Sequence, residues 1–123
     1  MLYAILCYDR EEVVHAWTKD QDAEAMRKLG LVEQKLSDQG RLGPVARLMP
    51  TTKAVTLRKG KSASVMDGPF AETKEQLLGF FVVDCASQEQ AVEAARELGE
   101  ASSSEGSYEI RPLMVFRANG VTT

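Results

Sequence analysis

The stretch Gly79-Phe80-Phe81-Val82-Val83-Asp84-Cys85 decides the fold of this 123-residue chain. Its aromatic and β-branched side chains predict a strand. Successive side chains of a strand point to opposite faces of its sheet, so Phe80 to Val83 put apolar groups on both faces. The first predicted strand, Leu2 to Tyr8, is also apolar on both sides. Strands of this kind need a layer of structure over each face of their sheet.

Two helices are expected to supply one of those layers. The first begins near Asp20 or Asp22, either of which can cap it, and ends at Gly40. Gly30 is a point at which this helix could kink. One apolar stripe recurs along it at helical spacing and comprises Ala25, Leu29, Val32 and Leu36.

The second helix begins after Ser87, which forms a capping box with Gln90, and it ends at Gly99. A short helical segment is expected over residues 11–17. The remaining strands are predicted over residues 43–49, 53–59, 63–66 and 108–117, the last of them interrupted at Pro112.

This order of elements predicts an α+β fold, a ferredoxin-like split βαβ with an enlarged central hairpin. Two helices can cover only one face of such a sheet, and the chain has no spare element for the other. A second copy is the simplest source of the missing layer. We therefore expect a homodimer whose sheets pack face to face as a dimeric α+β barrel.

The densest chemistry in the chain stands at residues 67–75, Asp-Gly-Pro-Phe-Ala-Glu-Thr-Lys-Glu, between two predicted strands. One interpretation is structural: Asp67 accepts hydrogen bonds in a turn, Phe70 fills the core and Thr73 caps one turn of helix. The other is functional, with Asp67 as a general base and Glu72 as a second carboxylate close enough to raise one pKa.

Charge is distributed unevenly around this segment. The net charge of −3 argues against nucleic acid as a direct partner. No acid occurs between Asp38 and Asp67, a stretch that holds six of the fifteen basic residues. It is either a solvated hairpin or a positive wall beside an anion-binding cleft. Candidate ligand-binding residues are Arg58, Glu72, Lys74 and Arg111, with the two arginines anchoring an anionic group.

His15 is the single histidine and a second catalytic candidate, which Asp9 or Glu12 could orient. One histidine without clustered acids predicts no metal site, and no cofactor-binding motif is present. Cys7 and Cys85 are expected to be reduced, buried thiols. With no membrane span and no signal peptide expected, the sequence predicts a cytoplasmic protein.

Several stretches identify a family resemblance. Residues 66–77 and the following Gly79-Phe80-Phe81 resemble the signature of the DGPF proteins, a branch of the YCII-related proteins, and residues 2–8 and 108–113 also fit. The resemblance implies one ferredoxin-like domain over residues 1–117, forming a dimeric α+β barrel. We expect a loose tail over residues 118–123.

The resemblance also bears on function. YCII-related proteins are suspected enzymes with a His and Asp pair in a cleft between sheet and helices, whose histidine belongs to the first long helix. His15 precedes that helix here, so the pair does not transfer residue by residue. DGPF proteins also resemble partners of extracytoplasmic-function sigma factors.

Three hypotheses follow. The first is a protein that binds or converts a small anionic metabolite in a cleft of the dimer, with Asp67 and His15 near the ligand. The second is a non-catalytic regulatory or protein-interaction module that acts with a sigma factor and exposes an apolar patch. In the third, residues 67–75 serve folding alone.

Overall fold

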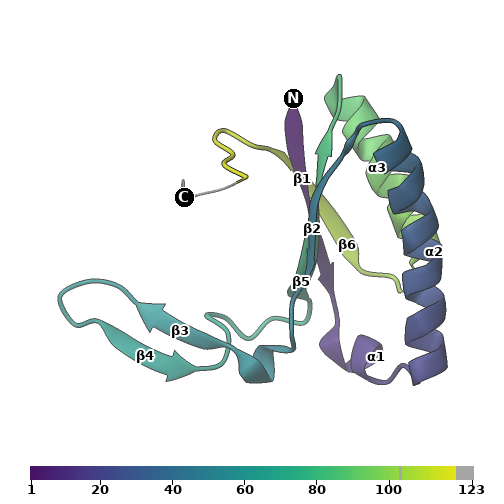
Figure 1. The fold of residues 1–123 in the computed structure, drawn as a ribbon. Helices are drawn as coiled ribbons and strands as arrows, with labels where there is room; N and C mark the ends of the chain where they lie inside the picture. Colours follow the sequence, from purple (N-terminus) through teal and green to yellow (C-terminus); the bar gives the residue numbers. More distant parts are fainter. Residues whose placement is uncertain (103, 119–123) are drawn as a thin grey trace.

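The computed structural model describes residues 1–102 and 104–118. It shows one sheet with two long helices packed against a single face, and a hairpin that extends away from the other side (Figure 1). The tail expected from residue 118 lies outside the described residues except for Ala118. Among the described residues, no helix is long and apolar enough to cross a membrane.

The main sheet is antiparallel and has the strand order β2-β5-β1-β6. Its strands are β1 (Leu2–Asp9), β2 (Leu42–Arg47), β5 (Gln76–Asp84) and β6 (Ser107–Pro112). The long helices are α2 (Lys19–Asp38) and α3 (Gln88–Ala101), and two short helical segments are α1 (Glu11–His15) and the 3-10 turn η1 (Thr51–Lys53). The predicted α+β class is confirmed, and the order is compatible with a ferredoxin-like split βαβ.

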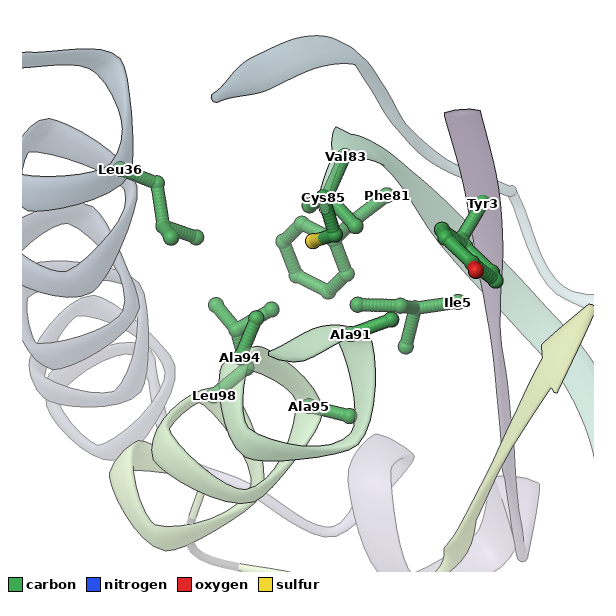
Figure 2. Close-up of a cluster of buried hydrophobic side chains, with 10 residues drawn as sticks. All are labelled: Tyr3, Ile5, Leu36, Phe81, Val83, Cys85, Ala91, Ala94, Ala95 and Leu98. Carbon is green, nitrogen blue, oxygen red and sulfur yellow. The ribbon is translucent and has the colours of Figure 1, made fainter. Parts of the chain in front are cut away.

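The core lies between the sheet and the two long helices. Alternate residues of β1 and β5 point toward the helices, as Figure 2 shows for Tyr3, Ile5, Phe81 and Val83. Helix α3 meets them with Ala91, Ala94, Ala95 and Leu98, while α2 contributes Leu36. Three alanines on one helix face let α3 pack close to the strands.

The helix boundaries differ from the predicted ones because side-chain caps compete locally. Thr18, rather than Asp20 or Asp22, caps α2: its hydroxyl accepts from the Gln21 N–H at 3.0 Å, and the Gln21 side chain accepts from the Thr18 N–H at 2.9 Å. Gly40 follows α2 in the left-handed region with φ +67°, as its predicted role requires.

Helix α3 is capped by Ser87 as predicted, since the Gln90 N–H donates to the Ser87 hydroxyl at 3.1 Å. The Gln90 side chain accepts from Ala86 rather than Ser87, so the reciprocal bond of the capping box is shifted by one residue. The predicted stop at Gly99 is wrong, because the helix continues to Ala101.

Strands β3 (Val55–Arg58) and β4 (Ser64–Asp67) form a separate two-stranded sheet, called the arm below. The arm projects from the side of the main sheet opposite the helices (Figure 1). Val55, Leu57 and Val65 share one of its faces and are 61–68% exposed. Of the strands expected in the enlarged central hairpin, β2 joins the main sheet, whereas β3 and β4 contribute no strand to it.

Two structural expectations for the segment after the arm are wrong. Phe70 does not fill the core, because its side chain is 85% exposed. Residues 73–76 form no helical turn, since the Thr73 hydroxyl donates to the Glu75 carbonyl and Gln76 already begins β5. Gly68 holds the turn instead: at φ +97° its N–H donates to the Ala54 carbonyl and its own carbonyl accepts from the Thr56 hydroxyl, both at 2.8 Å.

The face of the main sheet away from the helices, called the open face below, is apolar along its two central strands. The side chains that point there from β1 and β5 are Leu2, Ala4, Leu6, Phe80 and Val82. Both edge strands contain a proline, Pro44 in β2 and Pro112 in β6. A proline has no N–H to donate to a further strand.

Candidate functional site

A cavity of about 480 Å³ lies between the helix-side face of the main sheet and helices α1, α2 and α3. Its volume is in the range of small-molecule sites in proteins. Most of its wall is apolar, with Met26, Leu29, Phe81, Val92 and Ile110 among the lining residues. A few polar side chains interrupt that wall, and they give the cavity its chemistry.

Asp9 is the most deeply buried polar group of the cavity. It is the last residue of β1 and is 8% exposed. A bulge next to it, where Leu78 has no partner between Cys7 and Tyr8, bends this end of the strand pair, as bulges beside functional sites do. Gly106 passes so close that a Cβ there would be 2.8 Å from the Asp9 Cγ. The site therefore requires glycine at this position.

Cys7 and Tyr108 lie opposite each other on β1 and β6, and both face the cavity. Burial raises the pKa of the Cys7 thiol to about 12, and the nearby Tyr108 hydroxyl offsets part of that effect. Burial also raises the pKa of Tyr108, as do the adjacent Cys7 and the charge of Asp9. Both groups are neutral near pH 7, so they can donate hydrogen bonds but are poor nucleophiles.

Helix α2 adds a second acid, Glu33, whose pKa is raised by burial. The cationic residues of the wall are Arg47 and Arg96. Arg47 pairs with Asp22 at 2.7 Å, and this hydrogen bond lowers the pKa of Asp22. Arg96 pairs with Glu93 at 3.3 Å. Both arginines are thus engaged by acids of the same chain.

The residues expected to form a site around the signature do not line this cavity. Asp67 and Arg58 both belong to the arm but lie on opposite faces of it, because Asp67 pairs with Val55 and Arg58 with Ser64. Within the described residues, no hydrogen bond or ion pair involves either side chain, nor those of Glu72 and Lys74. The four residues are exposed.

Arg111 lies on β6 in alternation with Ile110, so it is on the open face, where it pairs with Glu109. His15 is exposed at the end of α1 and borders a small hollow of about 120 Å³ with Glu11 and Arg47. Burial acts to raise the pKa of Glu11, but hydrogen bonds from Thr51 and the charge of His15 lower it overall. The structure therefore does not bring Asp67 and His15 to one cavity.

Sequence reasoning missed the groups that do come together. Asp9 was considered only as a partner for His15, and Tyr108 only as part of a strand. The alternation of side chains along β1 could have identified Asp9. Because Tyr3, Ile5 and Cys7 point toward the core, Asp9 lies on the same face of the strand. An acid in that series is a buried carboxylate or a site.

No group of three or more potential metal-ligating side chains occurs within residues 1–102 and 104–118. The polar side chains of the cavity include hydrogen-bond donors and acceptors. They can orient a small molecule against an apolar wall, which is the usual design of a ligand pocket.

An antiparallel α+β domain with a cavity between its helices and its sheet is the class of protein that the fold and the site define. The YCII-related domain model matches residues 1–117. An uncharacterised protein of Rhizobium meliloti (strain 1021) is 56% identical over 118 residues, which are 95% of each chain. This chain belongs to the YCII-related family.

Proposed function

We propose that this protein binds a small organic molecule in the cavity between its helices and its sheet. The observation that carries the proposal is the composition of that cavity. The cavity has a volume of about 480 Å³, and Asp9, Cys7 and Tyr108 interrupt its apolar wall. Burying a carboxylate costs free energy unless it is paired, so an acid kept at such a place is a candidate recognition group.

A screen of small aromatic and aliphatic compounds by protein NMR tests this function. Binding is expected to shift the amide signals of Gly79, Gly106 and Tyr108, which border the cavity. Val92→Phe, which adds volume to the α3 side of the cavity, is expected to weaken binding by about tenfold or more. If no compound shifts these signals, the cavity is not a ligand site.

The same screen distinguishes two possible binding sites, the cavity and the signature at residues 67–75. An anionic metabolite held by Arg58, Lys74 or Arg111 would lie on the other side of the sheet, and a partner copy would be needed to bring those residues together. Asp67→Ala and Arg58→Ala are expected to leave binding in the cavity unchanged. Loss of binding in these variants with full binding in Val92→Phe would favour the signature.

The proposal includes a homodimer built through the open face. Its support is the set of apolar side chains that one copy leaves uncovered, including Val55, Leu57, Val65 and Phe70. Two open faces packed together would form a dimeric α+β barrel and supply the second layer that strands apolar on both sides require. A cytoplasmic location belongs to the proposal as well, supported by two free cysteines.

A protein-interaction module is the second candidate function, because the exposed arm also suits a different partner. If the purified chain is a monomer, the arm stays available to a protein such as an extracytoplasmic-function sigma factor from the same genome. Co-purification of that sigma factor with the wild-type chain, and not with Leu57→Asp, would favour this function. A stable homodimer that excludes the sigma factor would count against it.

A further inference from the structure

The charges around the cavity restrict the kind of ligand it can hold. Asp9 lines the cavity, and the residue as a whole is 8% exposed. Its Oδ1 accepts the Arg10 N–H at 2.7 Å. Within the described residues no other donor reaches this carboxylate. An ionised carboxylate can accept about four hydrogen bonds, so most of its capacity is unused.

The rest of the cavity adds no positive charge to complement Asp9. Glu33 is a second acid in the wall and makes no ion pair within the described residues. Arg47 and Arg96 are paired with Asp22 and Glu93, and their side chains are 49% and 61% exposed. The other polar side chains belong to uncharged residue types, namely Cys7, Tyr8, Trp17, Ser102, Ser104 and Tyr108. Acids therefore dominate the interior of the cavity.

An anionic ligand would have to enter against this field and would find no unengaged cation in the wall. A cationic or donor group next to Asp9 would gain a charge-assisted hydrogen bond beside a mostly apolar wall. The remaining surface of the ligand would contact Met26, Leu29, Phe81 and Val92, a wall suited to an aromatic or branched aliphatic body.

We propose that the cavity binds a compact amphipathic amine, with its ammonium group on the Asp9 carboxylate and its apolar body against α2, α3 and β5. The inference rests on the proposed function, because it names the ligand class of the same cavity. Glu33 is the second acid that lines the same cavity. No covalent step is involved.

A matched pair of probes tests the charge preference. Phenethylamine and 3-phenylpropionate carry the same ring on a short chain and differ in the sign of the end group. Calorimetry and NMR at pH 7 are expected to show the amine bound in the cavity at least about tenfold more tightly than the acid. Asp9→Asn keeps an acceptor for the Arg10 N–H and should remove about tenfold of the affinity for the amine.

Control variants and a neutral probe separate the possible failures. Glu89→Gln, an exposed acid of α3 outside the cavity, should leave amine binding unchanged. Neutral phenol binding as tightly as the amine, tighter binding of the acid, or full amine binding by folded Asp9→Asn would each overturn the inference while leaving a ligand cavity. If amine, acid and phenol all fail to bind, both the inference and the proposed function fall.

Discussion

Gly79 lies where β5 passes β2 so closely that a Cβ would be 2.4 Å from the Ala46 carbonyl oxygen. A Cβ added at Gly30 in α2 would have no atom within 4 Å beyond the adjacent residues and the backbone of its own helix. We expect Gly79→Ala to lower the free energy of unfolding by roughly 1–3 kcal/mol. Gly30→Ala should raise it by about 0.5–1 kcal/mol, because alanine reduces the entropy of the unfolded chain and favours helix.

Urea denaturation of the two variants against the wild type measures both effects. Equal stability of Gly79→Ala and the wild type would show that β2 and β5 separate easily. A destabilised Gly30→Ala would show that this glycine has a packing role that the structure does not reveal.

Cys7 gives the molecule a pH-dependent contribution to stability. Its pKa is about 12 in the folded protein, against 9.0 for an ordinary thiol. Below pH 9 the thiol is protonated in both states, so the contribution is fully present. Between pH 9 and 12 the unfolded thiol loses its proton first, which favours unfolding as the pH rises.

The free energy of unfolding is therefore expected to fall less steeply between pH 9 and 12 in Cys7→Ala than in the wild type. Denaturation at a series of pH values measures the difference. Cys85→Ala is a comparison variant, since it removes the other free thiol and leaves Cys7 in place. Identical slopes for the wild type and Cys7→Ala would contradict the burial of Cys7 against the cavity.

The arm is the element on which the proposed homodimer depends most. Leu57 on the arm and Leu31 on α2 are both 61% exposed, but only the arm is on the open side of the sheet. We expect Leu57→Asp to convert the dimer to a monomer and Leu31→Asp to leave it intact, because a charge at an apolar interface is costly to desolvate. Analytical ultracentrifugation distinguishes the two results.

At the scale of elements, the sequence predicted strands and helices well where periodicity is strong. The apolar stripe of α2 and the strand at residues 79–85 both correspond to observed elements. The predictions are wrong where several short polar residues can form the same local hydrogen bonds. Thr18 caps α2 in place of Asp20 or Asp22, and the Thr73 hydroxyl donates to the Glu75 carbonyl instead of capping a helical turn. Such choices depend on a single hydrogen bond each.

The candidate site was harder to predict than the fold because it is a property of the whole molecule. Asp9, Glu33 and Tyr108 come from β1, α2 and β6, and no spacing in the chain relates them. The signature at residues 67–75 predicted a site because its charged and turn-forming residues are concentrated in one segment. Most of that chemistry is exposed in a single copy.

Assembly also predicts how thermal stability responds to concentration. If each copy covers the arm and open face of the other, the melting temperature should rise as protein concentration increases roughly hundredfold, because the dimer forms only from folded chains. Leu57→Asp should melt at one temperature throughout. A wild-type melting temperature that stays constant, together with a monomeric mass, would rule out the homodimer.

The two edge prolines, Pro44 and Pro112, have a further consequence for a chain with so much uncovered apolar surface. Prolines on edge strands are a common feature that hinders sheets of neighbouring molecules from joining side by side. The helices already occupy one face, which leaves one face for contact. In the proposed homodimer that contact is between two like faces and is complete with two copies, so it does not propagate into an open-ended assembly.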